Sequence, residues 1–282
     1  MTPAAGSAWD ARFATRSPLF EPYLHVAARW QAAPAFPAHA ALAEALAASG
    51  PVANAAGRPL VPGLPSGPGS ALAYERSVWA DAVLGVRPDD WHDLMNLLVW
   101  CVFPATKARL NAGHVAQVDH AASGRRSARR DALTLFDENG LLVACADPSL
   151  ACLMREFRWR ELFVQRRADV ARAMRFLVFG HGLLDKARAP FVGLTAHALV
   201  LDVPPALLAQ PAATIAARLD GRLAQAVDRL QDPRALAPLP VLGIPGWWPA
   251  NEAPAFYDDT RYFRPGRQVR PQGPTAGSDP GV

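Results

Sequence analysis

The chain of 282 residues contains few lysines and few cysteines. Of its 29 basic residues only Lys107 and Lys186 are lysines, and the other 27 are arginines. Either two lysines survive by chance in an arginine-biased composition, or they mark places where a compact amine is required. The three cysteines, Cys101, Cys145 and Cys152, form no Cys-x-x-Cys motif. They are expected to be reduced packing residues, which argues against a thiolate zinc site.

Long apolar runs and recognised catalytic motifs are also missing. No stretch of about 18 or more apolar residues lacks a charge, so no transmembrane helix is expected. Residues 1–13 show no basic start followed by an apolar core, so no secretory signal is expected and a cytoplasmic location is predicted. The chain has no His-Glu-x-x-His, no Walker phosphate loop, no Gly-x-Ser-x-Gly and no Gly-x-Gly-x-x-Gly.

What is present is enough apolar sequence for a large core. The chain is 51% hydrophobic and 19% charged, which predicts a folded protein. We expect one globular domain over residues 1–266, with a Pro/Gly-rich loop at 50–70 and a disordered tail at 267–282. A domain boundary within the loop is the alternative.

The net charge of +4 permits nucleic-acid binding without arguing for it. Residues 123–130 (SGRRSARR) hold four arginines but no aromatic side chains, so nucleic acid is an unlikely partner. A solvated loop is predicted here, and a loop that closes over an anionic substrate is the alternative.

The segment from Trp91 to His114 concentrates polar groups in an apolar run. Asp89 or Asp90 can cap a first helix, Phe103-Pro104 breaks it, and proline suits the start of a second helix. His92, Asp93 and Asn96 share one face of the first helix, and Lys107, Asn111 and His114 form a stripe on the second. The two polar stripes can face each other. They form either a ligand site or a buried hydrogen-bond network.

The remaining elements predict a mainly helical protein. Residues 131–146 alternate around Asp137-Glu138-Asn139-Gly140, which predicts a β-hairpin with Asp137 and Glu138 in its turn. Helices are expected over 147–155, over 159–188 and over 204–230, and a strand over 193–203. The predicted fold class is therefore α+β, predominantly helical with a small antiparallel sheet. The aromatic-rich segment 239–264 must wrap the domain or meet a partner.

Further candidate residues lie outside the helical pair. His181 stands between Gly180 and Gly182, which leave room for a close approach, and Asp185 lies one turn later. Lys186 follows as the second lysine. Asp131 comes directly after the arginine loop, and His197 lies in the strand predicted over 193–203.

Five segments are long and specific: WHDLMNLLVWCVFPATKARLN, RDALTLFDENG, FGHGLLDK, GLTAH and LPVLGIPGWWPANEAPAFYDDTRYFRP. Together they resemble the bacterial family known as domain of unknown function 3025, over roughly residues 20–266. The resemblance implies no activity, substrate or cofactor, so no residue roles are carried over from it.

The polar groups favour a hydrolase-type enzyme with either a metal site or a metal-free acid/base site. The candidate catalytic residues are His92, Asp93, Lys107, His114, Asp131, His181 and Lys186. The candidate substrate-binding residues are Asn96, Asn111, Arg130 and His197. The expected ligand is a small anion, whereas the metal, the cofactor and the oligomeric state stay open. The alternative is a non-catalytic ligand-binding or protein-interaction domain.

Overall fold

The computed structural model describes residues 8–65, 71–119 and 127–266. The helices of these parts are α1 (Leu24–Ala27), α2 (His39–Ala48), α3 (Ala71–Arg76), α4 (Trp91–Val102), α5 (Pro104–Asp119), α6 (Ala128–Asn139), α7 (Pro148–Arg155), α8 (Arg167–Ala173), α9 (His181–Ala187), α10 (Pro205–Leu208) and α11 (Ala212–Asp228). The strands are β1 (Val61–Gly63), β2 (Val83–Gly85), β3 (Gly140–Cys145), β4 (Met174–Val178), β5 (Thr195–Asp202) and β6 (Ala237–Pro240). This is the predicted α+β fold with a predominance of helix.

A four-stranded mixed sheet lies at the centre, in the order β4-β3-β5-β6. The pairs β3–β4 and β5–β6 are antiparallel, as expected, but β3 and β5 run parallel. Every residue of β3 is buried, because strands flank it on both sides and helices cover it. The strands β1 and β2 form a separate parallel pair.

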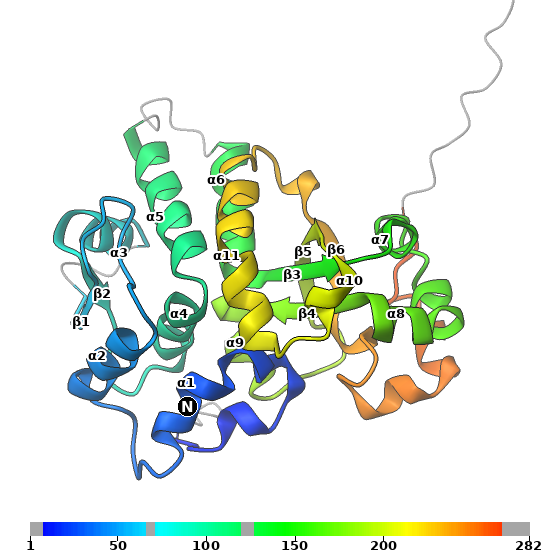
Figure 1. Ribbon diagram of the computed structural model, residues 1–282, viewed down its shortest axis with the longest axis horizontal. Coiled ribbons are helices and arrows are strands. Elements are labelled where there is room, and N and C mark those ends of the chain that lie inside the picture. Colours follow the sequence, from blue (N-terminus) through cyan, green and yellow to red (C-terminus); the bar gives the residue numbers. More distant parts are fainter. Residues whose placement is uncertain (1–7, 66–70, 120–126, 267–282) are drawn as a thin grey trace, which may run out of the picture.

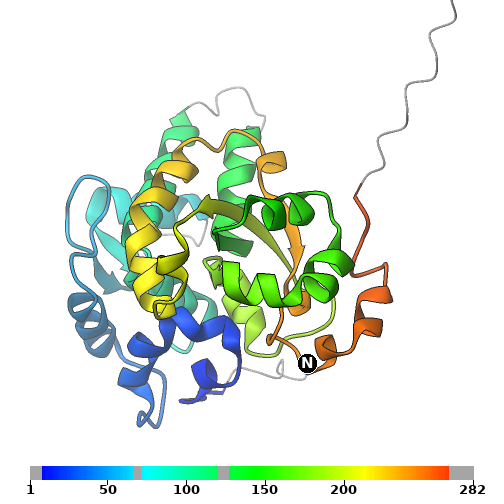
Figure 2. The same ribbon diagram turned by 45° about the vertical axis from the view of Figure 1, so that its right-hand side comes forward.

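Helices pack on both sides of this sheet. Figure 1 shows α5, α6 and α11 standing side by side next to the sheet, and α5 packs against both of the others. In Figure 2, α7, α8 and the C-terminal segment lie on the opposite side of the molecule from α2 and α3. Buried apolar side chains from Phe13 to Phe263 belong to one cluster.

The predicted helical pair at 91–114 is confirmed as α4 and α5. Asp90 caps α4, since its carboxylate accepts a hydrogen bond from the Asp93 N–H at 3.0 Å. The helix ends at Val102 with Phe103 as its C-cap, and Pro104 starts α5. Asp220 of α11 caps α5 from outside, because its carboxylate accepts hydrogen bonds from the N–H groups of Ala105 (2.7 Å) and Thr106 (2.9 Å).

The prediction of a β-hairpin over 131–146 is wrong. Residues 128–139 form helix α6, capped by Ser127, whose hydroxyl accepts from the Arg130 N–H. The buried residues Ala132, Leu133 and Phe136 follow helical spacing and outweigh the turn chemistry of Asn139-Gly140. That dipeptide ends the helix, and Gly140 begins β3.

Other elements agree better with the predictions made from the sequence. The helix over 147–155, the strand over 193–203 and the helices over 204–230 are confirmed as α7, β5, and α10 with α11. The helical interpretation of 159–188 is wrong in its middle, because Met174–Val178 forms β4. Of the predicted arginine loop, residues 127–130 cap and begin α6, while 123–126 and the predicted tail 267–282 lie outside the described residues.

The aromatic-rich segment near the C-terminus wraps the protein with short 3-10 turns. Tyr257, Tyr262 and Phe263 are buried. The Tyr262 hydroxyl donates to the Leu194 carbonyl at 2.7 Å and accepts from the Leu242 N–H at 2.9 Å. Among the described residues, no helix has the length and apolar character needed to cross a membrane.

Candidate functional site

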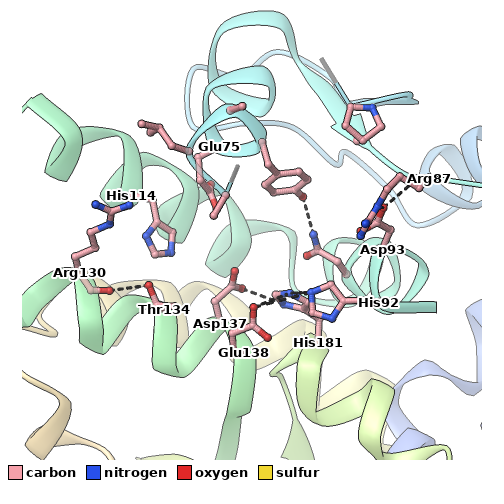
Figure 3. A pocket seen from close by; sticks show the side chains of 17 residues that line it. Glu75, Arg87, His92, Asp93, His114, Arg130, Thr134, Asp137, Glu138 and His181 are labelled. Carbon is pink, nitrogen blue, oxygen red and sulfur yellow. Dashed lines mark hydrogen bonds and ion pairs between the residues drawn. The ribbon is translucent and has the colours of Figure 1, made fainter. Parts of the chain in front are cut away.

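A pocket of about 400 Å³ opens where α3, α4, α6 and α9 meet. Figure 3 shows the side chains that line it, with Glu75, His92, Asp137, Glu138 and His181 contributed by these helices and His114 by α5. The side chains with polar groups at this pocket, here called the site pocket, are Tyr74, Glu75, Arg87, His92, Asp93, Asn96, His114, Arg130, Thr134, Asp137, Glu138 and His181.

Two imidazoles and one carboxylate meet on one side of the site pocket. His92 Nε2 lies 3.1 Å from His181 Nε2, and Glu138 Oε1 lies 3.5 Å from His181 Nε2 and 3.9 Å from His92 Nε2. His181 is buried, with its side chain 6% exposed, whereas His92 and Glu138 are about 40% exposed. Burial lowers the pKa of His181 to about 3, so this imidazole is neutral at physiological pH.

A buried ion pair lies next to the two imidazoles and Glu138. Lys107 on α5 donates to Asp137 on α6, with Nζ 2.6 Å from Oδ1. Burial by itself would raise the pKa of Asp137, but the charge of Lys107 and the hydrogen bond from its ammonium lower it to about 2. Asp137 Oδ1 also lies 3.8 Å from Nδ1 of His181. The ion pair therefore places a fixed negative charge beside the far nitrogen of His181.

The carboxyl group of Glu75 on α3 has a strongly raised pKa. Its Oε2 accepts a hydrogen bond from Asn111 Nδ2 at 2.6 Å. Burial and the negative charge of Asp137 raise the pKa of Glu75 from 4.5 to about 7, against the opposing effects of Lys107 and Asn111. Glu75 and Asp137 are two neighbouring carboxyl groups whose environments move their pKa values in opposite directions, a pattern found at acid/base sites.

The opposite wall of the site pocket is fixed by hydrogen bonds. Asn96 Nδ2 donates to the Tyr74 hydroxyl at 2.7 Å, while the buried Oδ1 of Asn96 has no hydrogen bond within the described residues. Arg87 binds Asp93 through Nε at 2.7 Å and Nη2 at 2.9 Å. Asp93 is thereby held as a structural partner of Arg87. Arg130, in contrast, makes no ion pair within the described parts of the chain.

Two glycines allow α9 to approach the end of α6. A Cβ on Gly180 would lie 2.4 Å from the backbone N of Gly140, and a Cβ on Gly182 would lie 2.3 Å from Glu138 Oε2. Real Cβ atoms do not approach other atoms so closely. The prediction that these glycines leave room for a close approach is confirmed, and the approach is what brings His181 to Glu138.

The structure brings together many of the predicted site residues, but not all. His92, Asp93, Asn96, His114, Arg130 and His181 line the site pocket. Lys107 and Asn111 lie behind its wall and bind Asp137 and Glu75. Asp131, Lys186 and His197 do not line it. Lys186 lies on α9 together with His181, but it donates to Asn139 Oδ1 at 3.1 Å and does not reach the pocket. His197 lies on β5, away from the helices that form the pocket.

The prediction that Asp137 and Glu138 are turn residues is wrong, because both belong to α6. Both face the site pocket from α6, as Figure 3 shows. Arg130, Thr134 and Asp137 lie at i, i+4 and i+7, so a helical interpretation of the sequence would have placed them on one stripe. Glu75 was missed as well, and no local pattern marks it, because its partner Asn111 lies on another helix.

Two groups of side chains could each hold a metal ion. One consists of His92, Glu138 and His181, and the other of Glu75, His114 and Asp137, with ligand atoms in each group within 4.8 Å of one another. In the second group Lys107 already binds Asp137, so an ammonium stands where a second cation would be needed. The first group has no competing cation of this kind among the described residues.

A second, more open hollow of about 800 Å³ lies on the other side of His92. Its aromatic lining comes from Trp9, Phe13, Trp91 and Phe191, and its lining also includes Lys186 and Arg188. The guanidinium of Arg188 lies 3.8 Å from the centre of the Trp91 ring. His92 lines both hollows and therefore stands at the junction between them.

Comparison with known proteins yields a family but no described relative. Neither the curated proteins nor the solved structures contain a significant match to the chain. The family described as "Protein of unknown function (DUF3025)" matches residues 65–267, a range that includes every residue of the two metal-capable groups. Because this match covers well over half of the chain, the protein belongs to that family of unknown function.

Proposed function

We propose that this protein is a hydrolase-type enzyme that acts on a small anionic substrate in the site pocket. The observation that supports it best is convergence: histidine, carboxylate and amide groups from α3, α4, α5, α6 and α9 meet around one accessible hollow. A purely structural network would be expected to satisfy its own polar atoms, yet the buried Oδ1 of Asn96 has no hydrogen bond within the described residues.

The proposed roles follow from the positions of the groups. Glu75, with a pKa of about 7, gives a proton to the leaving group or takes one from water. His92 and Glu138 stand at the exposed side of the imidazole pair and hold the attacking water. Arg130 binds the anionic group of the substrate, because its guanidinium has no ion pair within the described residues.

Activity is tested with a panel of anionic carboxylic esters, phosphate esters and amides. We expect turnover of at least one class, and a loss of at least about 100-fold in kcat/KM in the variants Glu75→Gln and His92→Ala. His197→Ala is the matched control, since His197 lies outside the site pocket, and it should retain wild-type turnover. Turnover that survives both site variants would contradict the proposal, and so would the absence of turnover across the panel.

A non-catalytic binding domain is the second candidate function. The open hollow beside His92 favours it, because Phe191 at its edge is 53% exposed and its neighbour Val192 is 49% exposed. Saturable binding of an aromatic probe such as 8-anilinonaphthalene-1-sulfonate, lost in Phe191→Ser, without any turnover would favour this function over catalysis.

We also infer that the described residues form one domain in a reducing compartment, which we take to be the cytoplasm. One cluster of buried apolar side chains extends from Phe13 to Phe263. Cys101 and Cys145 are free and buried, as expected for cysteines that serve as small apolar residues, whereas Cys152 is free but exposed and is not a packing residue. Limited proteolysis that releases two stable fragments would contradict the single domain.

A further inference from the structure

We propose that His92, His181 and Glu138 bind one divalent transition-metal ion of the zinc class. This deepens the proposed hydrolase, because a metal would supply the activated water, but the binding itself does not depend on any turnover. The three donor atoms are His92 Nε2, His181 Nε2 and Glu138 Oε1.

The separations of these atoms fit a metal centre. They are 3.1, 3.5 and 3.9 Å. A triangle with these sides has a centre about 2 Å from each corner, which is the length of a zinc–nitrogen or zinc–oxygen bond. The three atoms can therefore bind one ion with only small movements of the side chains.

The way the two imidazoles face each other also favours a cation between them. Two Nε2 atoms at 3.1 Å can form a direct hydrogen bond only if one carries a proton and the other does not. The Nδ1 atom of His181 lies on the side of the Asp137 carboxylate, at 3.8 Å, and this placement favours the proton on Nδ1 and leaves the lone pair on Nε2. A metal ion would accept the lone pairs of both imidazoles at once.

The surroundings of His181 resemble the outer shell of a metal site. Metal-binding histidines usually donate the N–H of their other ring nitrogen to a carboxylate or a carbonyl. Here the carboxylate of Asp137 lies 3.8 Å from Nδ1, which is longer than a hydrogen bond, so a small movement would be needed to form one. Lys107 fixes that carboxylate at 2.6 Å. The missing side chain of Gly182 leaves the space that Glu138 occupies, because a Cβ there would lie 2.3 Å from Oε2.

The same group leaves an open side for substrate. All three donors line the site pocket, and the side chains of His92 and Glu138 are about 40% exposed. Three protein ligands with an accessible fourth position are typical of catalytic zinc, whereas structural zinc sites are closed by four protein ligands. The ion would thus lower the pKa of a bound water at the place where the proposed reaction occurs.

The test is isothermal titration of the chelator-treated full-length protein with Zn²⁺, repeated with Co²⁺ to record its visible absorption. We expect about one zinc ion per chain. His92→Ala and Glu138→Gln should weaken binding by more than the roughly 10–100-fold typical of losing an outer-shell partner, and Asp137→Asn should fall within that range. The side chain of His92 is about 40% exposed, so His92→Ala is expected to fold, which circular dichroism checks.

His114→Ala is the matched control, because His114 belongs to the second metal-capable group and not to the first. It should keep wild-type zinc binding. Zinc binding that survives His92→Ala, or that disappears in His114→Ala, would overturn the assignment, and so would less than about 0.1 zinc per wild-type chain. Turnover by metal-free protein would overturn the metal's catalytic role while leaving the proposed hydrolase intact.

Discussion

Lys107 shows how a single buried charge organises the residues around it. Its side chain is 3% exposed, and its Nζ lies 2.6 Å from Asp137 and 5.7 Å from the centre of the Trp100 ring. Water cannot solvate the ammonium of a lysine at such a position. A carboxylate partner must therefore balance its charge. Asp137 in turn faces His181, and the ion pair thereby links α5 to the histidine of α9.

Replacing this lysine should be costly. Lys107→Met leaves the carboxylate of Asp137 buried without its cation, and we expect a loss of about 3–5 kcal/mol in the free energy of unfolding, measured by urea denaturation. Lys107→Met combined with Asp137→Leu should cost clearly less than the sum of the two single changes. Arg234→Ala, which removes an exposed ion pair with Asp232, serves as the control and should leave stability unchanged. Additive costs at the buried pair would contradict this account.

Glu75 predicts a specific pH dependence of stability. Its pKa is raised to about 7 in the folded protein, so folding favours its protonated form. The stabilising contribution is therefore complete below its ordinary pKa near 4.5 and is lost as the pH rises through about 7. The groups that face it are Asp137, which raises its pKa, Lys107 and Asn111, which oppose the rise, and His114, which has a ring nitrogen within 4.8 Å of its carboxylate.

This dependence can be measured with Glu75→Gln in the presence of a chelator. Between about pH 5 and about pH 8 the wild type should lose on the order of 2 kcal/mol in the free energy of unfolding relative to the variant. The exposed Glu44→Gln is the matched control and should follow the wild type. Parallel pH profiles for wild type and Glu75→Gln would show that Glu75 ionises normally.

At the scale of elements, the contact between the end of α6 and the start of α9 determines the geometry of the site. Gly180 lies against the backbone of Asn139 and Gly140, and this packing fixes the distance between His181 and Glu138. The Gly180 N–H donates to the Gly140 carbonyl at 2.8 Å, which ties the two elements together directly.

Adding one methyl group at Gly180 should therefore lower the stability of the protein and weaken zinc binding at the site. Gly180→Ala places a Cβ against backbone atoms that cannot rotate away, and we expect a cost of about 3 kcal/mol together with weaker zinc binding. Gly221→Ala is the matched control, because Gly221 lies inside α11 with open space around it. That change should raise stability by about 0.5–1 kcal/mol. Unaltered stability and zinc binding in Gly180→Ala would contradict the role given to this contact.

The elements also show where local sequence patterns predict the secondary structure correctly and where they do not. Pro104 and the cap at Asp90 are local signals, and they predict the break between α4 and α5 as it stands. At Asp137-Glu138-Asn139-Gly140 two local signals compete. Turn chemistry favours a hairpin, whereas the buried side chains of Leu133 and Phe136 favour a helix, and burial against the rest of the protein decides the outcome.

On the scale of the whole molecule, the site depends on contacts between segments far apart in the sequence. His92 and His181 are 89 residues apart and touch through Nε2, and Asn111 reaches Glu75 across 36 residues. The types of the site residues could be predicted from their unusual polar character within apolar runs. Their convergence in one pocket could not be predicted, because no local pattern specifies which helix faces line the same pocket. Glu75 was missed for this reason, and Asp131, which was predicted from its place after the arginine loop, does not line the site pocket.

The most direct test of the account is a crystal structure with zinc, located by its anomalous scattering. The account predicts an anomalous peak about 2 Å from Nε2 of His92, Nε2 of His181 and Oε1 of Glu138, on the side that opens to the site pocket. The contradicting result is a direct hydrogen bond between the two imidazoles, with no anomalous peak between them even when zinc is present in excess.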